Sequence, residues 1–134
     1  MEQERRIPEG RLAPVLDALG LEFLAGFLET ELRLHPENLG AWIELGHVYT
    51  RAKRYEEGLA VDRELVLRAP NDSTVRYNLA CSLALLNRTE EALDALEQAV
   101  ALGYEDPEHL LADPDLAGLR EEARFQEFVR GLAK

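Results

Sequence analysis

Apolar residues recur at spacings of three and four along most of the chain, which is the pattern of one buried helix face. Such stretches cover residues 41–49, 59–69, 75–86 and 92–102. Pro70 follows the second stretch and Gly103 follows the fourth, and these residue types commonly follow helix ends. No window shows sustained alternation with period two, so we expect helices and no strands.

The helical stretches repeat with a period of 34 residues. The clearest matches are Leu45 with Leu79, Gly46 with Ala80, Gly58 with Ala92, and Leu59 with Leu93. Small residues that recur in register let two helix backbones approach closely. Each period holds two helices joined by a short polar connector, so the sequence predicts tandem antiparallel helix pairs, an all-α solenoid.

These residues carry a resemblance to a known family. The pattern Trp42-x-x-Leu45-Gly46-x-x-Tyr49, followed by Gly58 and Pro70, resembles the tetratricopeptide repeat. The second copy resembles it less completely, and the departures are Arg76, Leu83 and Tyr104 at family seats, with Asp62 where the family has a large apolar residue. The resemblance implies a right-handed superhelical stack of helix pairs in which the first helix of each pair lines a concave groove.

We interpret residues 1–134 as a single domain of this kind. Its expected parts are a flexible N-terminus (1–10), degenerate N-terminal helices (11–36), two repeats (39–72 and 73–106) and C-terminal capping helices (107–134). Within 11–36 we expect a short helix over 11–19 and a second over 21–35. The C-terminal part resembles the terminal segment of many bacterial tetratricopeptide proteins, and a solenoid end needs such a cap because it otherwise exposes an apolar face.

Composition narrows the function classes. Acidic residues outnumber basic ones 26 to 15, for a formal net charge of -11, which disfavours nucleic acid and anionic membrane surfaces as partners. The chain has one cysteine, Cys81, and neither an apolar leader nor an apolar run long enough to span a membrane. We therefore expect a cytoplasmic protein.

The sequence offers little catalytic chemistry. It has no zinc-binding spacing of histidines, no phosphate-binding glycine loop and no nucleophile-elbow context, so we predict no enzyme, no cofactor and no metal. One alternative stays open, because His47 and Cys81 are 34 residues apart and Asp115 falls at the next such spacing. These three could meet at a metal. The favoured interpretation is that His47 is a polar residue of the groove and that Cys81 is a small, partly buried side chain that fills space between helices.

The resemblance places a partner-binding groove on the first helix of each repeat. The predicted groove residues are Ile43, His47, Thr50, Arg51, Thr74, Tyr77, Asn78 and Cys81. Relatives that bind C-terminal carboxylates use a clamp of basic residues and asparagines, of which only Asn78 matches, so we expect no acidic chaperone tail to bind. Ile43 and Tyr77 are predicted as apolar anchors. The alternative is that these groove residues are ordinary solvated side chains. Separately, Arg51, Lys53 and Arg54 form a basic cluster, which is either a solvated turn or a rim that steers an acidic segment.

The preferred function is a protein-interaction scaffold that binds a partner peptide or helix in the groove. The alternatives are a chaperone-like protein for a secreted or assembled client, and a regulatory or metal-dependent small-molecule module attached to an enzyme encoded elsewhere. Apolar residues cover more than one face of 21–35, so this helix packs between neighbours or presents a surface for self-association. The candidate residues for a homodimer contact are Phe23, Phe27 and Leu28.

Overall fold

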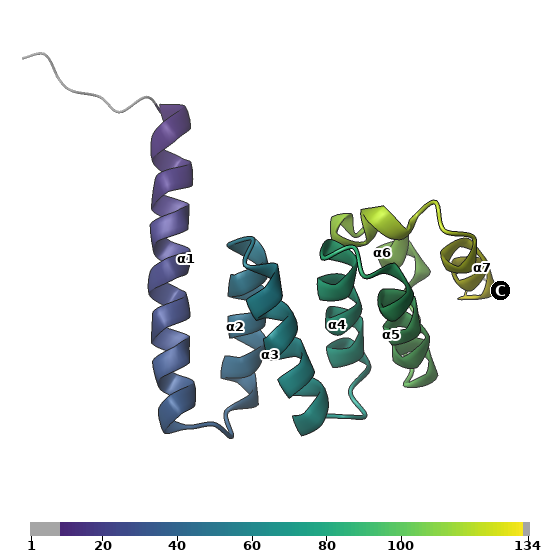
Figure 1. Cartoon of the computed structure of the whole chain (residues 1–134), viewed down its shortest axis with the longest axis horizontal. Coiled ribbons are helices and arrows are strands. Elements are labelled where there is room, and N and C mark those ends of the chain that lie inside the picture. The colour runs from purple at the N-terminus through teal and green to yellow at the C-terminus, as the bar shows by residue number, and fades with distance from the viewer. Residues whose placement is uncertain (1–8, 133–134) are drawn as a thin grey trace, which may run out of the picture.

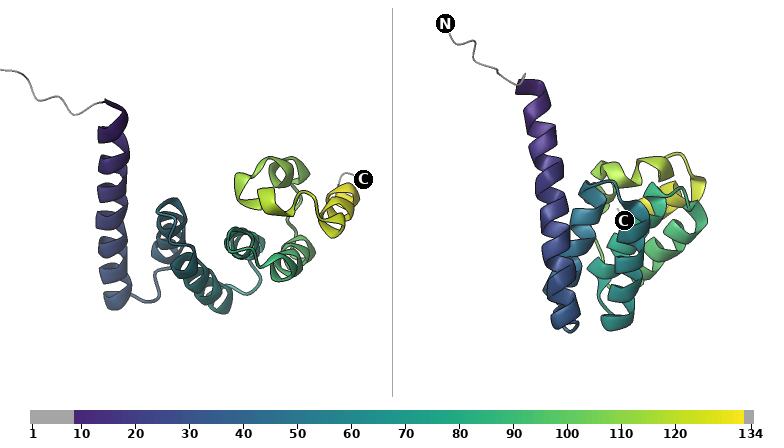
Figure 2. Two further views of the ribbon diagram at one scale, coloured as in Figure 1. Left: turned by 45° about the horizontal axis from the view of Figure 1, so that its top comes forward. Right: turned by 60° about the vertical axis from the view of Figure 1, so that its left-hand side comes forward.

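The computed structural model describes residues 9–132, and within them every regular element is a helix (Figure 1). The α-helices are α1 (Glu9–Leu34), α2 (Leu39–Arg51), α3 (Tyr55–Arg68), α4 (Ser73–Leu85), α5 (Thr89–Ala101), α6 (Pro107–Ala112) and α7 (Ala123–Leu132), with a 3₁₀ helix, η1 (Pro114–Leu119), between α6 and α7. Neighbouring helices pack side by side and follow a curved path (Figure 2). The all-α solenoid predicted from the sequence is confirmed.

The 34-residue period is visible in the backbone. Helices α2 and α4 are 13 residues each and start 34 residues apart, as do α3 and α5. The turns inside the two hairpins also match, because Lys53 and Asn87 both have a φ near +60°, at equivalent positions. Asn38 and Asp72 cap the first helix of each pair by accepting backbone N–H groups through their side chains.

The N-terminal helix differs from the expectation. One continuous helix covers Glu9–Leu34, so the predicted break between 11–19 and 21–35 is wrong. A lone glycine at position 20 lowers helix stability by only about 1 kcal/mol, and no turn or capping residue follows it to end the helix. Of the segment expected to be flexible, residues 9 and 10 begin this helix, and 1–8 lie outside the described residues.

Two hydrophobic clusters fill the solenoid. The first joins α1, α2 and α3 to Val75 of α4, with Leu45 and Leu65 nearly free of solvent contact. The second joins α4 and α5 to the C-terminal elements, which contribute Leu110, Leu116 and Phe125, each at most 1% exposed. The segment after Gly103 therefore packs into the core of the second repeat.

Small residues allow the close approach of α2 and α3. A Cβ placed on Gly46 would lie 3.4 Å from Val61 Cγ1, which is tighter than most such contacts. Gly58 faces α2 from the other side, and a Cβ there would lie 3.7 Å from Tyr49 Cβ. Helix crossing thus accounts for Gly46, whereas a Cβ at Gly58 would make ordinary van der Waals contacts.

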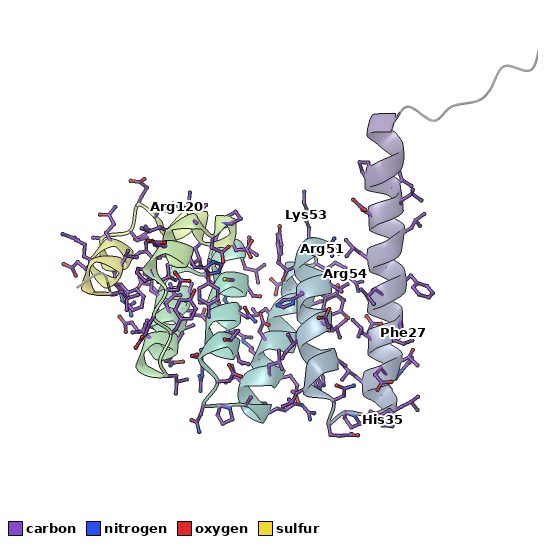
Figure 3. All side chains as sticks on the ribbon, turned by 180° about the vertical axis from the view of Figure 1, so that it is seen from behind. Phe27, His35, Arg51, Lys53, Arg54 and Arg120 are labelled. Carbon is purple, nitrogen blue, oxygen red and sulfur yellow. The ribbon has the colours of Figure 1, made fainter. Side chains whose placement is uncertain are left out.

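The basic cluster at the α2–α3 turn is partly engaged within the protein. Arg51, Lys53 and Arg54 lie together at one end of this hairpin (Figure 3). Arg54 pairs with Glu57, lies 3.4 Å from Glu22 of α1, and sits over the ring of Tyr49. This arginine is therefore a link between α1 and the first repeat, and neither a solvated turn residue nor a free rim charge.

Among the helices of residues 9–132, none combines the length and the hydropathy that a membrane span requires.

Candidate interaction groove

A cavity of about 460 Å³ opens where α2 and α4 meet the C-terminal segment. Its lining residues are Glu44, Gly46, His47, Thr50, Arg51, Asp62, Tyr77, Asn78, Cys81, Ser82, His109, Asp113 and Asp115. The first helices of the two repeats supply most of this lining, as the resemblance implied. The remainder comes from α3 and from the C-terminal segment, at α6, η1 and the turn between them.

The C-terminal wall of the cavity is organised around Asp113. The Tyr77 hydroxyl donates to Asp113 Oδ2, while the backbone N–H of Asp115 donates to Asp113 Oδ1 at 2.9 Å and so caps η1. The Tyr77 ring stacks on Tyr104 with centroids 4.6 Å apart and planes 8° from parallel. Burial raises the pKa of the Tyr77 phenol, and the nearby Cys81 and Asp113 act in the same direction. The tyrosine is therefore a neutral donor that fixes the carboxylate.

Cys81 lies beneath this wall. Its sulfur is 3.8 Å from Asp113 Oδ2, and the side chain is buried. Burial raises the pKa of the Cys81 thiol well above its usual range, and the charges of Asp113 and Asp115 raise it further. The thiol is thus protonated at neutral pH, which makes it a poor nucleophile.

The structure brings Cys81 close to two carboxylates. Ligand atoms of Cys81, Asp113 and Asp115 lie within 4.8 Å of one another, whereas His47 lines the same cavity outside this group. Both Asp113 oxygens already accept hydrogen bonds. Asp115 is therefore the carboxylate of this group whose oxygens accept no hydrogen bond from the described residues, and His47 contributes no ligand atom to it.

A second buried acid lies on the floor of the cavity. Asp62 of α3 is 5% exposed and accepts a hydrogen bond from the Ser82 hydroxyl of α4. Burial raises the pKa of Asp62 to about 6, against the opposing effect of the Ser82 hydrogen bond. The polar residue at this apolar family seat therefore joins the two repeats and has only a small exposed surface, which faces the cavity.

The residues predicted to form the groove divide between the cavity and other surroundings, and their role in partner binding stays a prediction. Six of the eight residues line the cavity: His47, Thr50, Arg51, Tyr77, Asn78 and Cys81. Ile43 instead packs against the first hydrophobic cluster, and Thr74 is exposed at the start of α4, outside the lining. Tyr77 is only 5% exposed beneath Tyr104. Tyr77 is therefore not available to a partner as an apolar anchor, and Ile43 is available only in part because it is partly buried.

The cavity is acidic instead. Four carboxylates line it, from Glu44, Asp62, Asp113 and Asp115, against one guanidinium, from Arg51. Sequence reasoning did not single out Glu44, Asp113 or His109 for the groove. The Asp113-Pro114 pair predicts a helix start, which the structure bears out, but the non-repeating C-terminal segment gives no register that would place it beside α4.

Comparison with known proteins supports the repeat. Residues 73–102, which span α4 and α5, match the family model described as "Tetratricopeptide repeat". A tetratricopeptide repeat is present in this chain. It coincides with the second helix pair and contributes Tyr77, Asn78, Cys81 and Ser82 to the cavity.

Two relatives from Arabidopsis thaliana extend this finding. One, a protein whose name describes it as chloroplastic, is 33% identical over 88 residues, which cover 63% of this chain and 26% of the relative. The other, "Cell division cycle protein 27 homolog B", is 36% identical over 67 residues, or 50% of this chain and 9% of the relative. The matches thus cover about a quarter or less of each relative's length. The repeat and these matches support a role in protein–protein interaction.

The comparisons leave other expectations as predictions. Both relatives are plant proteins, so a bacterial origin stays a prediction, as do the capping role of 107–134 and a cytoplasmic location. The absence of enzymatic activity likewise stays a prediction.

Proposed function

We propose that this chain is a protein-interaction module whose cavity receives a lysine or arginine side chain from a partner segment. The observation that carries the proposal is the set of four carboxylates around one cavity between α2, α4 and η1. A partner chain laid along the tetratricopeptide helices would place a side chain there, and charge complementarity would select a cationic one.

The charges facing the cavity favour a cation over an anion or an apolar group. Asp115 is half-buried, and its pKa is raised by burial and by Asp113, so its ionised form lacks a compensating partner. The ionised form of Asp62 likewise lacks a compensating positive charge, because the described hydrogen-bond partner of its carboxylate is the neutral hydroxyl of Ser82. An ammonium or guanidinium group in the cavity would compensate both charges. Because one charged hydrogen bond contributes about 1.5–3 kcal/mol, the preference should be large enough to measure.

The test is a peptide array probed with the intact 134-residue chain. The array holds matched peptides that differ at one central position, which is lysine, arginine, glutamate or leucine. We expect retention on the lysine and arginine series and little on the other two. Binding of a selected lysine peptide, followed by fluorescence anisotropy, should weaken as salt is added because the attraction is electrostatic.

Variants connect the preference to the cavity. Glu44→Gln with Asp115→Asn removes two cavity charges and should weaken the selected peptide by about tenfold or more. Glu121→Gln with Glu127→Gln removes two exposed charges near and on α7, outside the cavity, and is the matched control. A preference for glutamate or leucine peptides, or an equal loss in the control, contradicts the proposed site.

The proposal also predicts a pH dependence. Cation binding should strengthen as pH rises from about 5 to 7, because Asp62 ionises with a pKa of about 6. The other charged or titratable side chains that line the cavity are Glu44, His47, Arg51, Tyr77, Cys81, His109, Asp113 and Asp115. Asp62→Asn isolates the contribution of the aspartate: the variant should lose the part of the pH dependence between about pH 5 and 7 that Asp62 produces.

A further inference from the structure

Helix α1 carries two apolar faces on opposite sides. One face, with Ala25, Leu28 and Leu32, is buried in the first hydrophobic cluster. The other consists of Leu16, Leu19, Phe23, Phe27 and Leu34, which are 56–77% exposed, and we call it the α1 stripe. Leu28, expected from the sequence to join Phe23 and Phe27 in self-association, belongs to the buried face, because it lies about 100° around the helix from Phe27.

The α1 stripe runs straight along the helix. Leu16 and Phe27 are 11 residues apart, as are Phe23 and Leu34. Eleven residues make three helical turns plus about 20°, so the members of each pair point in nearly the same direction. From Leu16 to Leu34 the stripe is about 27 Å long at 1.5 Å per residue. A straight apolar face of this length suits side-by-side packing with another straight helix.

The upper part of α1 has no neighbour within the described chain. Figures 1 and 2 show α1 extending well past the end of α2, and residues 14–20 are all exposed. A helix segment without tertiary packing is marginally stable in water. A partner helix along the stripe would supply the missing contacts over this segment.

We propose that two copies of the chain pair through their α1 stripes. The five stripe residues, with Val15 and Leu24 at the margins, expose about 600–850 Å² of surface per chain, at about 150–200 Å² for a fully exposed large side chain. The largest apolar patch of a typical monomer is about 300–600 Å². Two copies would bury at most about 1,200–1,700 Å² in total, which is within the range of specific, stable interfaces. A face that pairs with itself satisfies the two-fold symmetry that most homodimers use.

The net negative charge of the two chains opposes this association, so the dependence of dimerisation on salt is a test of the proposal. Each chain carries a formal charge of -11, and the exposed residues beside the stripe include Asp17, Glu22 and Arg33. Repulsion between two such chains is screened over about 8 Å at physiological ionic strength and over shorter distances at higher salt. The dimer should therefore tighten with added salt, whereas the cation-binding cavity should weaken. Pairing through the stripe leaves that cavity, which α1 does not line, free in both copies.

The test is the mass of the intact chain by light scattering and sedimentation, up to about 100 µM and at about 0.1 and 0.5 M NaCl. We expect a species of twice the chain mass of 15.1 kDa, more populated at the higher salt. Phe23→Glu with Phe27→Glu should return the chain to its monomer mass. The matched control is Leu67→Glu with Leu111→Glu, which charges two exposed apolar residues outside α1 and should leave the dimer in place.

Each result decides the proposal. A parent chain that stays monomeric at both salt concentrations overturns it, and so does a dimer that persists in the Phe23/Phe27 variant or is lost equally in the control. Because all four substituted side chains are exposed, the helical circular dichroism signal should stay at the parent level. A variant that has lost this signal is replaced by Phe23→Ser with Phe27→Ser.

Discussion

Replacing Asp62 by asparagine should stabilise the protein at neutral pH. This acid lies on α3, is 5% exposed, and accepts a hydrogen bond from Ser82 of α4. Asparagine has nearly the same shape, and its amide oxygen can accept the same hydrogen bond. Its amide nitrogen would reach the cavity that Asp62 lines, where water can accept from it. The substitution therefore removes the buried charge and keeps the contact between the repeats.

The magnitude follows from the pKa of this side chain. Burial raises the pKa of Asp62 from 3.8 to about 6 in the folded protein. A difference of about 2 in pKa corresponds to about 3 kcal/mol between the two protonation states. Between about pH 4 and 6 the folded chain holds this proton and the unfolded chain has released it, so the free energy of unfolding falls as pH rises. Above about pH 6 the full penalty is present, and asparagine removes it.

Urea unfolding followed by circular dichroism measures the effect. Parent and Asp62→Asn should have nearly equal free energies of unfolding near about pH 3.5, and the variant should become more stable by up to about 3 kcal/mol near about pH 7.5. Glu127→Gln is the control. It neutralises an exposed acid on α7, so its stability should stay within about 0.5 kcal/mol of the parent at every pH.

Two results would refute this reasoning. If the difference between parent and Asp62→Asn does not change between about pH 4 and 7, the carboxylate ionises equally in the folded and unfolded states. If the variant is less stable than the parent at about pH 7.5 by more than about 1 kcal/mol, the charge of Asp62 is compensated in the folded protein.

Three further predictions concern the packing around the cavity. Tyr77→Phe removes the hydroxyl donated to Asp113 and should lower the free energy of unfolding by about 1–3 kcal/mol in urea titrations. Leu116→Ala truncates a fully buried side chain of η1 and should lower it by about 2–5 kcal/mol, with earlier proteolysis after residue 106 than in the parent. Cys81 should react with a thiol reagent in the native chain far more slowly than in the chain unfolded in urea, because its sulfur is buried and its pKa is raised.

The period of the sequence was enough to predict the repeats. Apolar spacing located the faces of α2 to α5, and the 34-residue offset put equivalent positions in register. The apolar pattern gave the wrong boundaries for α1. Gly20 was interpreted as a break between two helices, although a helix continues through a lone glycine at modest cost in stability. It also could not say which apolar residues stay exposed, because Leu28 and Phe27 are neighbours in sequence and lie on different faces of α1.

A departure from the family pattern can still preserve an interaction. Trp42 donates from its indole Nε1 to the backbone oxygen of Pro36 at 2.9 Å. Arg76 holds the equivalent position in the second repeat and donates from Nη2 to the backbone oxygen of Pro70 at 3.1 Å. The arginine thus satisfies the same carbonyl as the tryptophan. The sequence alone shows only that Arg76 departs from the family pattern, because the donor role of the side chain appears only in three dimensions.

Helical periodicity could not predict that the cavity is acidic. The period orients α2 and α4, so it correctly brought His47 and Cys81 to one cavity. It carries no information on the segment after Gly103, which has lost the repeat, and that segment decides what the groove is. Tyr104 covers Tyr77 and removes an apolar anchor, while Asp113 and Asp115 add negative charge beside Cys81. A groove that would be mixed in an isolated pair of repeats thereby becomes acidic, so the specificity of the proposed site depends on the C-terminal segment as much as on the repeats.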